Sequence, residues 1–439
     1  MKIAFVNQPF DRILPPLQNS LGICTYGAAR ALAKFADVIV YGNRDLHEDV
    51  PGDFVDNDVR YRFVPSYAHE QILFATHRKL NLSGIPIQRA ITAAWSYSSF
   101  VRKVAHDLGK ERCDIIHIQN FSQYVPVIRS FNPQAKIIYQ QHAQLFSQHN
   151  SRCLARRFQK ADLFATVSEY LTSTARLQFP MLADRLATIY NGIDPDEFSR
   201  EKDYRAACNR GEKRILYAGN ISPSKGIHVL LDAFKLILQR YPLVRLDIVG
   251  RNFSYPLLDM FDHADRLSIA SVKPWYAIDY SARLKARFSL APKDAGSYGF
   301  RLRASLPPEV AAKVAFPGHL SHAELADRYR DADVFVFPPV NDEGFGLPPL
   351  EAMAAGTPVV ATRSGAICEI VKDGETGICV GKNDAPALAQ AIINLLENDA
   401  LRERMGLAAR QRALLRFTWD RVAEQMYAKY KALLEPATV

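Results

Sequence analysis

The chain has 439 residues, of which 48% are hydrophobic and 23% are charged. This composition is ordinary for a globular protein of about two or three domains, and it excludes a disordered, collagen-like or small disulfide-stapled chain. The net charge of +9 favours anionic lipid or a phosphate-bearing substrate as a partner, but the basic residues are too dispersed to indicate nucleic acid.

The first residues do not have the pattern of a secretion signal. The segment Met1 to Val6 lacks the long apolar core and the small-residue cleavage site of a signal peptide. No apolar run approaches the ~20 residues that span a bilayer. The six cysteines are scattered and form no Cys-x-x-Cys pair, which favours reduced thiols over zinc ligands or disulfides. We therefore expect a cytoplasmic protein.

Short apolar strands alternate with helical segments in the first half of the chain. Helices are expected over 26–34 and 88–108. Six short segments are rich in β-branched and apolar residues, which predicts strands that are buried on both faces: 2–7, 37–41, 114–118, 136–139, 163–167 and 187–190. This alternation is typical of a parallel α/β domain, which we place at residues 1–195.

The same alternation restarts after a charged stretch, 196–213, that we interpret as a linker. A helix is expected over 227–240, and a helical stretch over 385–434 closes the chain. Strands are predicted at five segments: 214–219, 245–250, 314–316, 334–337 and 358–361. Residues 266–303 interrupt this pattern with interleaved basic and aromatic residues, as a surface elaboration or a functional lid.

The most informative segment runs from Glu343 to Glu351, directly after a predicted buried strand. Pro348 suits the first position of a helix, because its missing N–H would be unpaired there. Gly344 and Gly346 allow close backbone approach and leave amides at the helix start, where phosphate binds. The two carboxylates can accept hydrogen bonds from the vicinal hydroxyls of a ribose or a sugar ring. Glu351 by itself could instead complement the helix dipole.

A second strand–loop–helix junction occupies residues 218–226. Gly219 allows the chain to turn, Ser224 can cap the helix and Lys225 offers a positive charge to a phosphate. Two such junctions in one domain could together hold a diphosphate.

These segments resemble glycosyltransferase family 4, whose members are retaining enzymes with the GT-B fold. The span from Glu343 to Glu351 matches the family's E-x7-E signature. Six further segments extend the resemblance: 114–117, 161–169, 191–194, 332–336, 356–362 and 374–377. The resemblance implies two Rossmann-like domains with parallel sheets facing across a cleft: an acceptor-binding domain at 1–195 and a nucleotide-sugar-binding domain at 196–418. It also implies a C-terminal helix, 419–439, that crosses back to the first domain.

The resemblance further implies roles for individual residues. Glu351 would bind the ribose hydroxyls of a nucleotide sugar, Glu343 would hold the transferred sugar, and Lys225 would neutralise the leaving diphosphate. His142 resembles the first-domain histidine that contacts the donor sugar; His117 and His149 are nearby alternatives. The positions implied in donor binding are Gly22, Gly219, Asn220, Lys225, Gly344, Phe345, Gly346, Leu347 and Glu351. The donor would carry UDP or GDP, and neither a cofactor nor a metal is expected.

Two positions depart from the family pattern. Asn220 stands where the family usually has an arginine, so we expect a basic residue to substitute, from Arg251 or from Arg301 and Arg303 of the insert. The first-domain loop has only Gly22 where the family often has a Gly-Gly pair.

Three other interpretations compete with this one. Paired carboxylates also occur in glycosidases, where they flank the scissile bond ~5 to 9.5 Å apart. Asp331-Ala332-Asp333 and Asp194-Pro195-Asp196 resemble the metal-binding D-x-D of a different glycosyltransferase fold, although Asp333 is more simply the polar boundary of a strand. A nucleotide-sugar-binding protein with weak or no catalysis is the third alternative.

The acceptor is indicated least directly. We expect transfer of a hexose-type sugar to an acceptor hydroxyl in bacterial polysaccharide or envelope glycan synthesis, with a small soluble acceptor as the alternative. Residues 65–102 mix aromatic and basic side chains, as on a surface that contacts an anionic membrane or a lipid-linked acceptor. A buried helix flanked by solvated charges would have the same composition. The expected location is the cytoplasm, with peripheral contact at the inner face of the membrane.

Overall fold

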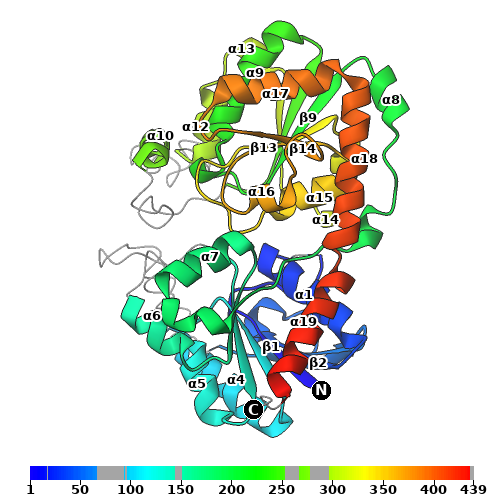
Figure 1. The fold of residues 1–439 in the computed structure, drawn as a ribbon. Helices are drawn as coiled ribbons and strands as arrows, with labels where there is room; N and C mark the ends of the chain where they lie inside the picture. Colours follow the sequence, from blue (N-terminus) through cyan, green and yellow to red (C-terminus); the bar gives the residue numbers. More distant parts are fainter. Residues whose placement is uncertain are drawn as a thin grey trace. The chain divides into compact units, whose positions relative to one another are not determined.

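The computed structural model describes residues 1–16, 18–66, 93, 96–143, 151–252, 266–276 and 296–435. These residues form two units, each built on its own sheet (Figure 1). Unit 1 consists of Met1–Asp194 together with Phe417–Val439, and unit 2 consists of Pro195–Arg416. The C-terminal segment therefore returns to the first unit. Among the described residues, no helix is both long and apolar enough to cross a membrane.

The sheet of unit 1 has eight strands in the order β3-β4-β2-β1-β5-β6-β7-β8. Their bounds are β1 (Lys2–Val6), β2 (Asp37–Asn43), β3 (Asp53–Asp56), β4 (Val59–Val64), β5 (Ile115–Gln119), β6 (Lys136–Gln141), β7 (Leu163–Thr166) and β8 (Leu186–Thr188). Only β3 and β4 pair antiparallel, which corrects the expectation of a wholly parallel sheet. Asn57 and Asp58 have positive φ angles of 49° and 60° and form the two-residue turn that this hairpin requires.

Helices cover both faces of this sheet (Figure 1). α1 (Ser20–Ala33) packs against α19 (Trp419–Leu434), and α4 (Ser98–Glu111) packs against α5 (Tyr124–Phe131). α6 (Ser151–Phe158), α7 (Glu169–Gln178) and η3 (Pro180–Arg185) follow. The core between strands and helices is apolar, and β1 is fully buried from Ile3 to Val6.

Two helices of unit 1 begin at positions that differ from the prediction. α1 starts at residue 20 rather than 26, because the Asn19 side chain caps it by accepting a hydrogen bond from Gly22 N. α4 starts at residue 98, because Tyr97 has a left-handed φ of 51° that a continuous helix excludes. Of the rest of the predicted helix 88–108, residues 88–92, 94 and 95 lie outside the described part.

The sheet of unit 2 has six parallel strands in the order β11-β10-β9-β12-β13-β14. Their bounds are β9 (Lys213–Ala218), β10 (Val244–Val249), β11 (Val314–Gly318), β12 (Val334–Phe337), β13 (Val359–Thr362) and β14 (Gly377–Val380). The chain builds outward from β9 in one direction and then from β12 in the other. The carboxyl ends of β9 and β12 are thus a topological switch point, where open α/β sheets bind ligands.

Helices also cover both faces of the second sheet (Figure 1). α9 (Ile227–Arg240) and α17 (Ala385–Glu397) pack together on one face, and α14 (His322–Asp331) and α15 (Leu347–Ala354) on the other. The remaining helical elements are η4 (Pro195–Phe198), α8 (Tyr204–Asn209), η5 (Pro223–Lys225), α10 (Arg266–Tyr276), α12 (Tyr298–Ala304), α13 (Pro308–Ala311), α16 (Ile367–Ile370) and α18 (Asp399–Arg416). Of the predicted insert, residues 277–295 lie outside the described part.

The stretch 196–213 is not an extended linker. It contains α8 and all but the first residue of η4, and its Lys202 side chain is buried against unit 2, where Nζ donates to Arg330 O at 2.6 Å. The chain passes from unit 1 to unit 2 between Asp194 and Pro195 and returns between Arg416 and Phe417.

Candidate active site

The switch point of unit 2 brings together the two loops that the sequence singles out. The loop after β9 and the loop after β12 are joined by a hydrogen bond from Val340 N to Ser224 O at 2.9 Å. Gly226 lies where they meet, with a φ of +68°, and a Cβ atom there would be 1.9 Å from Pro338 O. Only glycine allows so close an approach. The loops therefore form one rigid rim at the carboxyl ends of the strands.

Lys225 and Glu343 form an ion pair across this rim, although they are 118 residues apart in sequence. The ammonium also lies 5.5 Å from the centre of the Phe337 ring. Both side chains are largely buried, with 21% and 12% exposed for Lys225 and Glu343. The loop after β13 holds the Glu343 backbone in place, because Ala366 N donates a hydrogen bond to Glu343 O at 3.0 Å. A fixed cation and a fixed carboxylate thus face each other at the switch point.

Backbone N–H groups gather at the start of α15. Gly346 is the N-cap, with a φ of +106°, so the helix begins at Leu347 and Pro348 takes its second position rather than the first. The N–H groups of Gly344, Gly346 and Leu347 have no hydrogen-bond partner among the described residues. Such a helix start suits an anion, since its amides and dipole both favour negative charge. The neighbouring Phe345 side chain is buried.

Glu351 lies beyond the first turn of α15 and is almost completely buried, with 5% of its surface exposed. Its Oε2 accepts a hydrogen bond from the Tyr329 hydroxyl at 2.8 Å, and its Oε1 is 3.1 Å from His322 Nε2. Each of the two acidic residues of the motif therefore has its own partner: a lysine for Glu343, and a tyrosine and a histidine for Glu351.

His322 and Tyr329 are residues that the sequence analysis missed. Both lie on α14, seven residues apart, and two helical turns place such residues on the same face. That spacing was a visible signal, but nothing in the sequence tied α14 to α15. His322 also contacts Glu197 of η4, with 2.8 Å between Nδ1 and Oε2. Burial lowers the pKa of His322, but the hydrogen bonds and charges of Glu197 and Glu351 outweigh it and raise the pKa to about 10.

In the loop after β9, the exposed Asn220 stands where the family usually has an arginine. Its carbonyl accepts a hydrogen bond from the Tyr217 hydroxyl at 2.9 Å. Of the three arginines considered as substitutes, Arg301 donates to the carbonyl oxygens of Trp275 and Pro274, and Arg303 lies over the Phe316 ring. Arg251 is exposed, and its carbonyl accepts from Ile221 N at 2.8 Å. Arg251 is therefore held beside the loop, at the end of the neighbouring strand β10.

The described part of the insert braces the start of α9. The Tyr298 hydroxyl of α12 accepts a hydrogen bond from His228 N at 2.9 Å and lies 2.8 Å from Nδ1 of the same histidine. Trp275 of α10 stacks edge-on against Tyr298, with ring centres 5.3 Å apart. This cluster begins three residues after Lys225, so the insert supports the loop that carries the lysine.

The predicted site residues of the first domain lie in unit 1. Gly22 is in the first turn of α1, where a Cβ atom would lie 1.8 Å from Arg12 O. His142 follows β6, and its Nε2 lies 2.6 Å from Gln119 Oε1. Burial, with a smaller contribution from His117, lowers the pKa of His142 to about 3, so the ring is neutral near pH 7. His117 is buried in β5 against Tyr430, and His149 lies outside the described residues.

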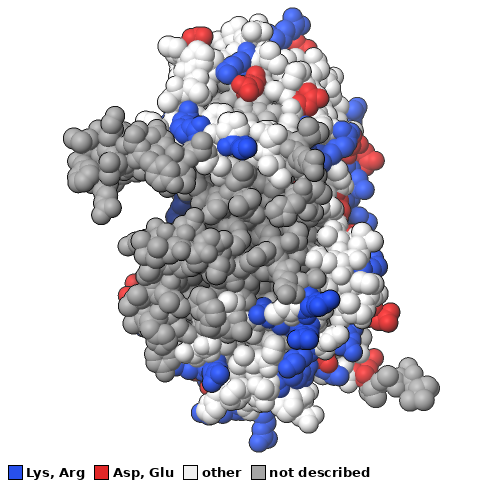
Figure 2. Space-filling model, turned by 90° about the vertical axis from the view of Figure 1, so that its left-hand side faces the viewer, with Lys and Arg blue, Asp and Glu red and all other residues white. Residues whose placement is uncertain are grey.

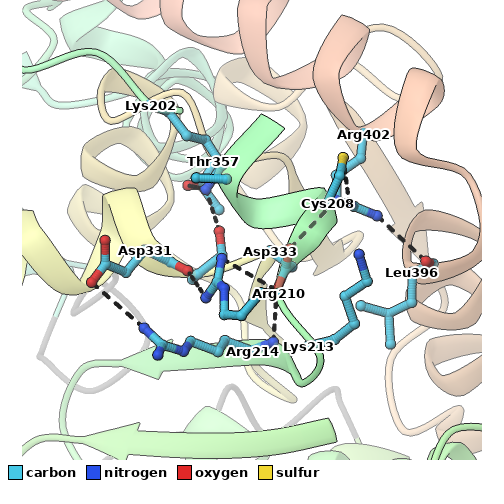
Figure 3. A network of polar contacts seen from close by, with 12 residues as sticks. Lys202, Cys208, Arg210, Lys213, Arg214, Asp331, Asp333, Thr357, Leu396 and Arg402 are labelled. Carbon is cyan, nitrogen blue, oxygen red and sulfur yellow. Dashed lines mark hydrogen bonds and ion pairs between the residues drawn. The ribbon is translucent and has the colours of Figure 1, made fainter. Parts of the chain in front are cut away.

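The D-x-D pattern of Asp331 and Asp333 belongs to a structural network (Figure 3). Asp333 is fully buried at the amino end of β12, where Oδ2 accepts from Arg214 N at 2.7 Å and Oδ1 lies 3.6 Å from Arg402 Nε. Asp331 pairs with the Arg214 side chain at 3.6 Å. These carboxylates are at the opposite end of the strand from the loops described above. Within the described ranges, no group of three His, Cys, Asp or Glu side chains is arranged to hold a metal ion.

Comparisons with known proteins agree with this architecture. The model of the family described as Glycosyltransferase Family 4 matches residues 22–197, and that described as Glycosyl transferases group 1 matches residues 303–412. The phosphatidyl-myo-inositol mannosyltransferase of Mycobacterium tuberculosis is 33% identical over 263 residues, which cover 59% of this chain and 57% of that protein.

Solved structures with the same fold cover nearly the whole chain. Sucrose-phosphate synthase from Thermosynechococcus elongatus superposes with a TM-score of 0.66 at 21% identity, over 98% of each chain. The Anabaena protein HepE, solved in complex with UDP, superposes with a TM-score of 0.63 at 18% identity, over 98% of this chain and 100% of that one. Sheet topology and superposition thus show the GT-B fold. The chain is a glycosyltransferase and belongs to family 4.

Proposed function

We propose that this enzyme moves a hexose-type sugar from a nucleoside diphosphate sugar to an acceptor hydroxyl and retains the anomeric configuration. The observation that carries the proposal is the Lys225–Glu343 ion pair at the switch point. Glu343 precedes the buried Glu351 by eight residues. In this proposal Glu351 accepts the ribose hydroxyls, Glu343 accepts hydroxyls of the sugar, and the N–H groups at the start of α15 face the diphosphate.

The chemistry proposed for Lys225 is stabilisation of the leaving group. Negative charge develops on the diphosphate as the bond to the sugar breaks, and a preorganised ammonium lowers the energy of that state more than the energy of the ground state. Retention would follow from attack of the acceptor on the face that the diphosphate leaves, with a diphosphate oxygen accepting the acceptor's proton. His142, neutral near pH 7, would contribute a hydrogen bond to the sugar rather than a charge.

The diphosphate has a second proposed cation, Arg251. It lies beside the Asn220 loop, where Ile221 N donates a hydrogen bond to the Arg251 carbonyl and holds its backbone in place. The other two candidate arginines already contact carbonyl oxygens or an aromatic ring. We assign Arg251 the role that an arginine at position 220 would otherwise have.

The proposed acceptor is a growing polysaccharide or a lipid-linked glycan of a bacterial envelope, reached by peripheral contact with an anionic membrane. Residues 67–92, 94 and 95 of the predicted surface lie outside the described part. α6 supports the idea independently: Arg152, Arg156 and the following Lys160 are exposed, while Leu154 and Phe158 are buried. α6 lies on the left-hand side of Figure 1, and Figure 2 shows that side from the front. Lys and Arg side chains are grouped in the lower half of Figure 2. Flotation with anionic liposomes at low salt tests this contact, and no co-flotation would contradict it.

A thermal-shift screen tests the donor. UDP, GDP, ADP and dTDP, each with its common sugar conjugates, are compared on wild type, on Glu351→Ala and on Glu403→Ala, which removes an exposed carboxylate on α18. A ligand at ~100 times its dissociation constant stabilises the folded state by about 2.7 kcal/mol. We expect one nucleotide to shift wild type and the control but not Glu351→Ala. Binding without sugar transfer to any acceptor would favour the non-catalytic alternative, and the anomeric proton signal of the product tests retention.

A further inference from the structure

His322 connects two carboxylates of unit 2 in a way that its own helix does not require. Nδ1 lies 2.8 Å from Glu197 Oε2, and Nε2 lies 3.1 Å from Glu351 Oε1. A carboxylate only accepts hydrogen bonds, so both ring nitrogens donate at once only when the imidazole carries two protons. The geometry therefore describes an imidazolium between two carboxylates.

This cation is placed where a helix disfavours it. His322 is the first residue of α14, at the positive end of the helix dipole, and only 25% of its side chain is exposed. The start of α14 is already complete without it, because Ser321 and Glu324 form a capping box. The arrangement thus costs free energy and adds nothing to the capping of α14, which points to a role at Glu351.

We propose that His322 is a positioning residue for the donor-binding carboxylate Glu351 and that Glu197 keeps His322 protonated. This inference rests on the proposed function, in which Glu351 binds the nucleotide ribose. Each oxygen of a carboxylate has two lone pairs. His322 takes one on Oε1 and Tyr329 takes one on Oε2, which leaves one on each oxygen for two vicinal hydroxyls.

The groups around His322 predict how this arrangement responds to pH. η4 contributes Glu197 and the Phe198 ring, α15 contributes Glu351, and α14 itself contributes Tyr329. Arg410 of α18 is bound to the carbonyls of Phe198 and Ala354. Since the carboxylates raise the pKa of His322 to about 10, the imidazolium persists well above neutral pH. Removing the Glu197 charge lowers that pKa and releases the proton at lower pH.

Two measurements on the full-length chain test the proposal. Wild type, Glu197→Gln and His322→Gln are compared with Glu403→Gln, which removes an exposed charge on α18. Nitrogen-15 NMR of labelled histidines follows the imidazole from pH 6 to 10.5, with the His322 signal assigned by its loss in His322→Gln. Calorimetric titration with UDP, GDP, ADP and dTDP gives affinity over the same range. Glu197→Gln is the milder variant, because 43% of that side chain is exposed.

We expect the His322 titration and the loss of nucleotide affinity to move together to lower pH in Glu197→Gln, by a unit or more, so that the variant binds at least about twofold more weakly than wild type at pH 9. Wild type and Glu403→Gln should coincide. Nucleotide binding with the same pH profile in wild type and Glu197→Gln overturns the positioning role alone, as does a wild-type His322 that titrates near 6.5. If wild type binds none of the four nucleotides, the proposed function itself fails, and this role with it.

Discussion

At the scale of single residues, the site of unit 2 consists of charges that are already paired before any ligand binds. Lys225 is bound to Glu343, and Glu351 is bound to Tyr329 and His322. Pairing reduces the cost of burying these charges and holds them in one geometry. A donor would therefore meet a preorganised site, in which a diphosphate shares the lysine with Glu343.

Lys225→Ala tests the role of the ammonium. Because the charge would act mainly as the diphosphate leaves, we expect kcat to fall by about 100- to 1,000-fold, the effect of removing one stabilising donor from a developing anion. Donor affinity should change less. Lys235→Ala is the matched control, because Lys235 lies on α9 and pairs with Asp232 on the surface. Initial rates of nucleotide release give kcat and KM for both variants. A rise in KM of that size with unchanged kcat would contradict the assignment.

Arg251→Ala tests the replacement for the missing arginine at position 220. An arginine–phosphate contact is worth roughly 1.5–3 kcal/mol, so we expect the affinity for the nucleoside diphosphate to fall about tenfold or more. The affinity for the nucleoside alone should not change. Arg245→Ala provides the comparison, since Arg245 is also exposed and lies at the other end of β10. Calorimetric titration of each variant with the nucleoside diphosphate and with the nucleoside measures these affinities. Equal affinities for the diphosphate in the two variants would exclude Arg251.

At the scale of elements, the docking of α19 on unit 1 depends on space left by glycines. The Trp419 indole, 7% exposed, lies against Gly27 of α1 and Gly192. A Cβ atom at Gly27 would be 2.1 Å from Trp419 Nε1, and one at Gly192 would be 2.8 Å from Cδ2. The His117 ring contacts Tyr430 near the other end of the helix. The C-terminal helix is thus an integral part of the first unit.

Gly27→Ala should therefore destabilise unit 1, even though alanine is the better helix former. The added methyl group would overpack the contact with Trp419, and we expect this to lower the free energy of unfolding by about 1–3 kcal/mol. Gly211→Ala is the control, because nothing lies within 4 Å of a Cβ atom at that position. Urea unfolding followed by tryptophan fluorescence measures the change, and equal midpoints for the two variants would show that α19 does not pack as described.

At the scale of the whole molecule, buried titratable groups set the dependence of stability on pH. Burial lowers the pKa of His117 and His142 to about 3 and that of His228 to about 4, and it raises the pKa of Asp11 to about 7. Below pH 6.5 the unfolded chain binds protons at the three histidines that the folded chain excludes, whereas folded Asp11 binds one that the unfolded chain lacks. From these four groups the net excess in the unfolded state is about two protons, and His47 and His319, whose pKa values burial also lowers, act in the same direction.

We therefore expect the free energy of unfolding to fall by about 3 kcal/mol per pH unit as the pH drops from 6 to 5. His322 has the opposite sign: its raised pKa stabilises the folded state fully below pH 6.5, and this contribution is lost as the pH rises toward 10. Lys202, whose pKa burial lowers to about 7, has the opposite effect between pH 7 and 10, so the two contributions largely cancel and stability should change little above pH 7. Urea unfolding of wild type and His117→Gln measures the slope, which the variant should reduce, while His106→Gln at an exposed position should leave it unchanged. A flat profile between pH 5 and 6.5 would contradict the account.

Local patterns in the sequence were sufficient for the fold class, the family and most strand positions. Apolar runs of β-branched residues mark buried parallel strands wherever they occur, and the E-x7-E segment combines glycines, a proline and two acids that are informative together. Helix starts were less predictable, because Asn19 capping and the left-handed Tyr97 depend on single backbone conformations. The edge hairpin β3–β4 was missed for the same reason, since its turn is only two residues long.

Contacts between distant segments were decided only by the tertiary structure. The sequence by itself predicted Lys225, Glu343 and Glu351 as charged residues of a nucleotide-sugar site, because their motifs are contiguous along the chain and resemble those of the family. It did not determine that His322 and Tyr329 hold Glu351, that Arg251 rather than Arg301 lies beside the Asn220 loop, or that Asp333 is buried against Arg402. Those relations arise from the order in which parallel strands pair, and strand order brings together residues whose spacing in sequence carries no record of it.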